Sequence, residues 1–176
     1  MKTWVLLAWI GLVGFPHAQD QKPPVPAEKE KIFVIVNPLN PIDSLTKEDV
    51  KNLFLCKELT WERRISGMKK AADANHAVKS DEAFDPREKV QPIELAHAKE
   101  HDAFFTQVLE KDEDALERYW IKLQYQSAIK RPKRVGTAER VIKYTAALKG
   151  CVGYINARDL DEQARKLVKV VFVLEI

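Results

Sequence analysis

The segment from Arg140 to Ile155, RVIKYTAALKGCVGYI, constrains the fold of this chain more than any other part of the sequence. A helical segment ends at Gly150, a residue that suits a helix C-cap. An apolar strand begins at once at Cys151 and carries a second glycine, Gly153. The segment therefore predicts a helix and a buried strand joined through a single glycine.

Strands and helices are predicted to alternate along the rest of the chain. Short β-branched runs bounded by turn residues predict strands, and amphipathic runs behind capping residues predict helices. The predicted strands are Ile32 to Val36, Val90 to Leu95, Cys151 to Ile155 and Leu167 to Ile176. The predicted helices are Lys47 to Cys56, His97 to Leu109, Ala115 to Tyr125, a helix capped by Thr137 that runs to Lys149, and Asp159 to Lys166. Lys69 to Lys89 is predicted as a surface excursion and Lys130 to Arg134 as a basic loop. The alternation predicts a three-layer-like α/β fold, a mostly parallel sheet with flanking helices.

Composition narrows the classes of function. A chain of 176 residues can bury one core, so a single domain is expected. The formal net charge of +3 is small and dispersed, whereas a nucleic-acid-binding domain carries a clustered basic face. Nucleic acid is therefore not an expected partner. The sequence has no glycine-rich phosphate loop, nucleophile elbow, CxxC pair or EF-hand loop, so no cofactor is expected.

The N-terminus predicts export. Lys2 precedes an apolar run from Trp4 to Phe15, and the small residue Ala18 follows, which is the order of a secretory signal peptide. The apolar run is too short for a stable membrane span. Residues 1–18 are therefore predicted as a signal peptide, with a cut nearer Gly14 or an uncleaved anchor as alternatives. The mature chain is expected in a bacterial periplasm, without a transmembrane span.

A proline-rich leader is predicted at residues 19–31. Pro23, Pro24 and Pro26 lie there among charged residues, which favours an extended, flexible tether. The folded domain is then expected to occupy residues 32–176.

Three segments resemble the substrate-binding proteins of phosphate ABC transporters, which have the type 2 periplasmic binding fold. The segment from Arg140 to Ile155 is similar to the family signature V..YV...PGAIGYV. SLTKEDVKNLFLCKELTW, from Ser44 to Trp61, and FFTQVLEKDEDALERYW, from Phe104 to Trp120, follow in the family's order. The resemblance implies one lobe of a periplasmic binding protein, non-enzymatic and related to transport. A closing cleft needs two lobes, so the uptake mechanism of the two-lobed proteins does not carry over.

The resemblance also implies where an anion would bind. The family holds its anion with hydroxyls, helix N-terminal amides and an arginine, and its hook, R.DGSGT..F, should lie just before Phe104. This chain has IELAHAKEHDAFF there, and Glu94 and Glu100 would repel an anion. Helix caps explain several of the remaining hydroxyls without any ligand. The remaining ligand-binding candidates are Ser44, Thr46, Ser66, Gly67 and Thr137.

Cys56 and Cys151 are the only cysteines of the chain. They stand where the family patterns usually have small residues, glycine in IFLGK and alanine in GAIGY. An oxidising compartment favours pairing. A disulfide between them would close a loop of roughly 95 residues and stabilise the fold by about 4 to 5 kcal/mol. Two buried free thiols are the alternative.

The string HAKEH, with His97, Glu100 and His101, matches the H-x-x-E-H pattern of inverted zinc peptidases. In a helix, the two histidines lie one turn apart and reach one metal, with Glu100 beside them as a base. The spacing selects no third ligand. Two surface histidines on a solvated helical start are therefore the favoured interpretation, and no metal site is predicted; a zinc peptidase is the enzyme alternative.

Two functions remain open at this point. The first is an exported binding-protein-like domain for a small oxyanion. The second is a ligand-free scaffold or interaction module of a periplasmic envelope assembly, with an envelope protein as its partner. The missing hook favours the second function, and the family pattern around Ser44, Trp61 and Gly153 favours the first.

Overall fold

The computed structural model describes residues 30–66, 84–96 and 99–176, with the side chains of the last range described from His101 onwards. The predicted signal peptide, most of the predicted leader, much of the predicted surface excursion, Gly67 and His97 lie outside the described residues. The predicted cleavage site and the tether therefore stay predictions.

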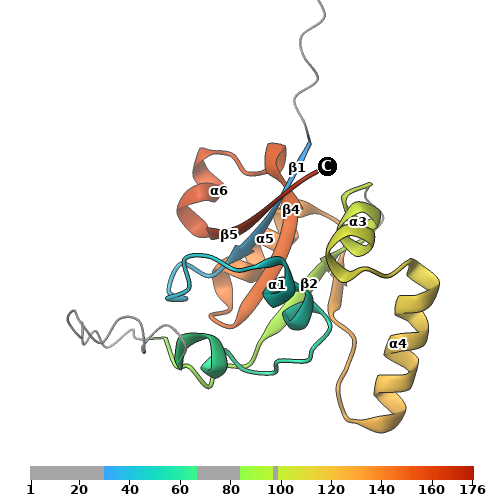
Figure 1. The fold of residues 1–176 in the computed structure, drawn as a ribbon. Coiled ribbons are helices and arrows are strands. Elements are labelled where there is room, and N and C mark those ends of the chain that lie inside the picture. The colour runs from blue at the N-terminus through green and yellow to red at the C-terminus, as the bar shows by residue number, and fades with distance from the viewer. Residues whose placement is uncertain (1–29, 67–83, 97–98) are drawn as a thin grey trace, which may run out of the picture.

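Five strands form one sheet in the order β3-β2-β4-β1-β5 (Figure 1). The strands are β1 (Lys31–Val36), β2 (Gln91–Leu95), β3 (Lys133–Val135), β4 (Cys151–Asn156) and β5 (Lys169–Glu175). The α-helices are α1 (Lys47–Phe54), α3 (Lys99–Phe104), α4 (Glu113–Gln126), α5 (Ala138–Ala147) and α6 (Glu162–Leu167). A π-helix, η1 (Phe105–Leu109), follows α3, a 3-10 helix, η2 (Ala157–Asp159), follows β4, and residues 62–66 form one further helical turn. β2 is parallel to β3 and to β4, whereas β1 is antiparallel to β4 and to β5. Four strands thus run in one direction, and the predicted α/β fold is confirmed. The sheet is mixed and not mostly parallel as predicted, because β1 runs against both of its neighbours.

Helices cover both faces of the sheet. Successive side chains of a strand point to opposite faces, and β4 shows what covers each face. A Cβ atom on Gly153 would meet Val141 of α5. Tyr154 points the other way, where its ring stacks on Phe104 at 4.1 Å between centroids and meets Phe54 of α1 at 5.7 Å. Every residue of β4 is buried, as expected for a central strand covered on both faces.

The two glycines of the Arg140–Ile155 segment allow close packing. The predicted C-cap at Gly150 is wrong, because α5 ends at Ala147 with Leu148 as its C-cap and no described glycine has a positive φ. A Cβ on Gly150 would clash with the carbonyl oxygen of Lys89. A Cβ on Gly153 would clash with a methyl group of Val141. Both glycines are therefore places where another segment presses against the backbone around β4.

Three predicted elements differ in the structure. The end of the predicted basic loop, Lys130 to Arg134, belongs to β3, whose three residues are too few to show a strand period. The helix predicted from His97 to Leu109 is divided into α3 and the π-helix η1, which ends at Glu110 with a left-handed φ of 55°. The helix predicted from Asp159 to Lys166 is divided as well, because the Asp161 side chain caps a new helix, α6, by accepting a hydrogen bond from the Ala164 amide.

The predicted disulfide between Cys56 and Cys151 is not formed in the structure, where both residues are free thiols. Cys151 points to the α5 face, where its Sγ lies 3.6 Å from Thr145 Oγ1. Cys56 follows α1, the helix that covers the opposite face. Burial raises the pKa of both thiols to about 11. The two thiols are held by different layers of the domain, a separation that the linear sequence does not show.

Candidate functional site

The candidate site lies at the carboxyl ends of the parallel strands β2 and β3. The chain leaves β2 towards α3, and it leaves β3 directly into α5, whose first turn is capped by Thr137. Ligands of open α/β sheets bind at this edge, where helix N-termini point their amides outwards. The side chains at this edge therefore decide what the domain can bind.

A buried carboxylate occupies this edge. Glu94 has no exposed surface. Its Oε2 accepts a hydrogen bond of 3.0 Å from Arg134 Nε, and Arg131 Nε lies 3.7 Å from the same oxygen, within ion-pair distance. The β2-β3 ladder creates the contact, because it pairs Glu94 with Arg134. Burial raises the pKa of Glu94 to about 7, and the hydrogen bond from Arg134 limits the rise.

Helix α4 supplies two more carboxylates to the same arginines. Arg131 Nη1 lies 2.9 Å from Glu117 Oε2, and Arg134 Nη1 lies 3.9 Å from Glu113 Oε1. Two cations thus face three carboxylates. Four buried polar atoms of this cluster have no hydrogen-bond partner among the described residues: Glu94 Oε1, Arg131 Nε, Arg131 Nη2 and Arg134 Nη2. The cluster is held together by charge, and only part of its hydrogen-bonding capacity is used.

His101 and Tyr154 extend the polar cluster into the core. His101 Nδ1 lies 2.8 Å from the Tyr154 hydroxyl, which donates a hydrogen bond of 3.2 Å to the Leu95 carbonyl oxygen. These contacts fit a neutral imidazole with its proton on Nδ1. Burial, with a smaller contribution from Arg134, lowers the pKa of His101, and burial raises that of Tyr154 well above its ordinary value. Both groups stay uncharged near neutral pH and bind each other.

His101 is therefore not the surface histidine that the sequence favoured. It is 5% exposed, and its ring packs 3.8 Å from that of Phe105. The helical spacing of HAKEH did not show this burial, because spacing identifies one face of a helix and not what covers that face. Among the residues that the structure describes, no group of three or more His, Cys, Asp or Glu is arranged to hold a metal ion.

Two of the predicted ligand-binding residues serve as helix caps. Thr46 Oγ1 accepts a hydrogen bond from the Asp49 amide, and the Asp49 carboxylate accepts one from the Thr46 amide, which is a capping box. Thr137 caps α5 through the Arg140 amide. Of this set, Thr137 follows β3 at the candidate site, while Thr46 begins α1.

The other candidates lie on the surface or outside the described residues. Ser44 and Ser66 are exposed, in the loop before α1 and at the end of the 62–66 turn. Gly67 is outside the described part of the chain. Within that part, no hydrogen bond joins Ser44, Thr46, Ser66 and Thr137 to one another, so the structure does not assemble them into one cluster.

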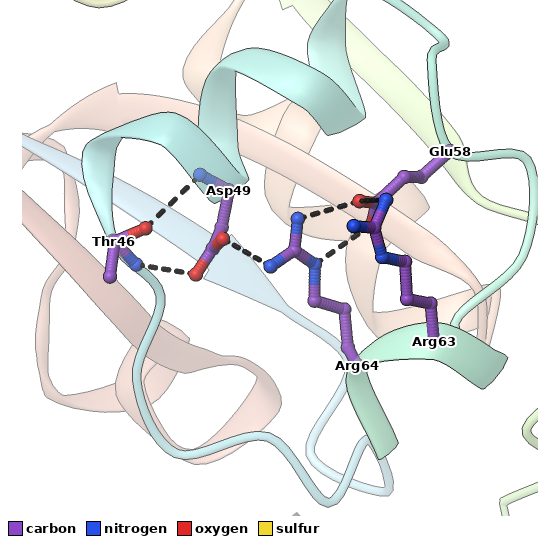
Figure 2. Close-up of polar contacts among 5 residues, drawn as sticks. All are labelled: Thr46, Asp49, Glu58, Arg63 and Arg64. Carbon is purple, nitrogen blue, oxygen red and sulfur yellow. Dashed lines mark hydrogen bonds and ion pairs between the residues drawn. The ribbon is translucent and has the colours of Figure 1, made fainter. Parts of the chain in front are cut away.

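An ionic network fixes the segment after α1 (Figure 2). Arg64 donates two hydrogen bonds of 2.7 Å to the buried Glu58 and also pairs with Asp49, the residue of the capping box. The exposed Arg63 adds a contact of 3.5 Å to Glu58. Each charged group in this network has an opposite partner, so the network positions the 62–66 turn against α1.

The sequence alone did not select the two arginines as site residues. They lie in the basic run from Lys130 to Arg134 beside Thr137, and such a run is typical of a solvated loop. The ladder between β2 and β3 turns this run towards Glu94, and only the pairing register reveals it.

The fold is similar to solved phosphate-binding proteins, although no family model matches the sequence and no curated protein matches it. A possible phosphate binding protein from Planctomyces limnophilus is similar with a TM-score of 0.51 and 16% identity, over 81% of this chain and 40% of that chain. A putative phosphate ABC transporter substrate-binding protein with bound phosphate, from Clostridium perfringens, has a TM-score of 0.51 and 17% identity, over 81% and 44%. An ABC-type phosphate transport receptor from Vibrio cholerae has a TM-score of 0.50 and 14% identity, over 81% and 45%.

This chain spans less than half the length of each of these three proteins. At such identities the likeness shows the fold alone. None of the helices described here is long and apolar enough to cross a membrane. The similarity to the solved structures shows that the chain has the α/β fold of one lobe of a phosphate-type periplasmic binding protein.

Proposed function

We propose that the protein is an exported, non-enzymatic domain with a binding-protein fold that recognises a partner protein of the cell envelope and binds no free oxyanion. The observation that carries this proposal is the position of Glu94. Its buried carboxylate accepts the hydrogen bond from Arg134 that an anionic ligand would otherwise accept. The protein places its own carboxyl group at the edge where ligands of this fold class bind.

The charge balance supports the same function. Arg131 and Arg134 face three carboxylates, Glu94, Glu113 and Glu117. A phosphate or sulfate ion would bring further negative charge next to a buried carboxylate, and an uncompensated buried charge costs several kcal/mol. The cluster therefore disfavours a free oxyanion.

Export is supported by the order of residues at the N-terminus, with Lys2 before the apolar run and Ala18 after it. We expect the mature chain in the periplasm to begin at Gln19. N-terminal sequencing or intact mass of protein isolated from the periplasmic fraction tests this. A mass that includes residues 1–18 would contradict cleavage.

Oxyanion binding is the second candidate function, and one observation favours it. Three guanidinium nitrogens, Nε and Nη2 of Arg131 and Nη2 of Arg134, are buried and have no hydrogen-bond partner among the described residues. Guanidinium groups bind phosphate well. An oxyanion that displaced Glu94 from the arginines would use these donors.

Thermal unfolding separates the two functions. The mature protein is unfolded in chloride buffer with and without millimolar phosphate or sulfate, at matched ionic strength. A ligand at a hundred times its Kd adds about 2.7 kcal/mol, which raises the Tm of a domain of this size by roughly 5 to 10 °C. We expect no shift with either anion. A rise of several degrees with phosphate or sulfate would establish the oxyanion function and overturn our proposal.

A further inference from the structure

A groove of about 700 Å³ lies beside the outer edge of β2 and adjoins the Glu94 cluster, because Arg131 belongs to both. We call it the basic groove. We call its apolar side chains the floor; they come from four separate segments, which contribute Leu59, Pro92, Ile129 and Leu148. Leu59 is 51% exposed, so the floor is open to a partner. Exposed apolar surface inside a groove marks an interaction site more often than scattered apolar residues do.

The short strand β3 creates the basic groove. β3 pairs with β2 only over Ile93 to Leu95, so the first residues of β2 have no strand on that side. The chain before β3 also lines the groove, with Ile129 and Pro132. Pro92 at the open edge has no amide hydrogen, so an added strand would lack a donor there. A partner is therefore recognised by side chains and not by strand addition.

Four cations surround this apolar floor: Lys89, Lys130, Arg131 and Lys133. No acidic residue lines the basic groove among the residues that the structure describes. Lys89 and Lys130 make no ion pair with the described residues, whereas Arg131 is bound to Glu94 and Glu117. Lys133 Nζ lies 4.0 Å from the centroid of the Tyr144 ring. Lys89 and Lys130 are thus the charges available to a partner.

We propose that the basic groove binds an acidic segment of a partner protein, with apolar side chains of that segment seated on the floor. Charge complementarity selects the acidic residues, and the apolar floor selects the Leu or Phe side chains between them. The concave shape favours a protruding segment over a flat lipid surface. This inference rests on the proposed interaction function, because it names the surface and the chemistry of the partner.

Fluorescence anisotropy with a labelled peptide tests the inference. The probe is Glu-Leu-Asp-Phe-Glu-Leu-Asp, and the control peptide carries Lys at each acidic position. The mature protein is compared with the double variant Lys89→Glu/Lys130→Glu. Lys166→Glu on α6 is the matched control, because Lys166 is exposed and lies outside the basic groove. Leu59→Ser separately tests the apolar floor.

We expect the acidic peptide to bind, and the lysine peptide not to bind. The double variant should weaken binding by about tenfold or more, since two favourable charges become repulsive, and Leu59→Ser should weaken it several-fold. Lys166→Glu should change it by less than about twofold. Melting curves confirm that each variant is folded; if the double variant is not, Lys130→Gln and Leu59→Ser carry the test.

Three results would overturn the inference: no binding of the acidic peptide, equal binding of both peptides, or equal loss in the Lys166→Glu control. Binding of the protein to phosphatidylglycerol vesicles that is lost in the double variant, without peptide binding, would assign the basic groove to lipid instead. None of these outcomes depends on the anion experiment above. A failed peptide experiment with no phosphate shift leaves the interaction function standing on another surface.

Discussion

Glu94 and Arg134 lie side by side on the parallel strands β2 and β3, and they are joined by a hydrogen bond of 3.0 Å that only one carboxylate oxygen uses. The other oxygen, Oε1, is buried and has no hydrogen-bond partner among the described residues. A buried carboxylate with one oxygen satisfied is a costly arrangement. Because the arrangement is costly, substitution of Glu94 and changes in pH should alter the stability of the protein measurably.

Truncation of Glu94 should create an anion site. Glu94→Ala leaves Arg131 and Arg134 without the central carboxylate and should destabilise the protein by about 2 to 4 kcal/mol. The atoms removed correspond to acetate, so acetate should restore part of the lost stability, seen as a rise in Tm of a few degrees at pH 7. Glu94→Gln fills the same space and is the matched control. Equal effects of acetate on Glu94→Ala and on the wild-type protein would show that the carboxylate does not occupy an anion position.

Stability should fall as the pH rises through the window in which Glu94 titrates. The pKa of its carboxyl is about 7 in the folded state, against an ordinary value of 4.5. Between these two values the folded protein binds a proton that the unfolded chain has lost, so the free energy of unfolding decreases with pH, by about 3 kcal/mol at most. Urea unfolding from pH 5 to pH 8 measures this.

The neighbouring His101 has the opposite effect on the pH dependence of stability. Burial lowers its pKa, so the unfolded chain binds a proton more readily than the folded protein and the free energy of unfolding decreases as the pH falls. The difference in the free energy of unfolding between the wild-type protein and Glu94→Gln, followed against pH, isolates the contribution of the Glu94 carboxyl group. We expect the variant to gain stability relative to the wild type as the pH rises. Parallel pH profiles for the two proteins would contradict the raised pKa.

Cys56 should prefer glycine to alanine. Its φ is 51°, in the left-handed region where a side chain is unfavourable. Cys56→Gly should therefore be more stable than Cys56→Ala by about 1 kcal/mol, the reverse of the usual order. Chemical denaturation of the two variants measures the difference. Cys151, in the extended strand β4, is the control position, where alanine should be the more stable replacement. The same order at both positions would be inconsistent with strain at Cys56.

Gly153→Ala should destabilise the protein, because the new methyl group would clash with Val141 of α5. Overpacking of this kind costs about 1 to 3 kcal/mol. The double variant Gly153→Ala/Val141→Ala removes the opposing methyl groups and should lose less stability than the two single changes added together. Strictly additive losses in a double-mutant cycle would show that the two residues do not press on each other.

The sequence alone determined the elements whose causes are local. Thr137 caps α5 as predicted, and α1 begins at the predicted Lys47 behind the Thr46 cap, since a cap involves residues three positions apart. The apolar run that begins at Cys151 predicts a buried strand there, and the structure confirms it as β4. The resemblance of the sequence to one lobe of a phosphate-type binding protein agrees with the solved structures. Such features need no knowledge of which segments meet.

Tertiary structure decided everything that depends on segments distant in the chain. Strand pairing brought Arg134 to Glu94, and packing of α3 on the sheet buried His101 against Tyr154. Opposite layers of the domain kept Cys56 and Cys151 apart. The register of a ladder and the burial of a side chain arise from the summed packing of the whole domain. The sequence therefore determined the helices and strands of this protein, and only their packing determined which charged groups meet at its candidate site.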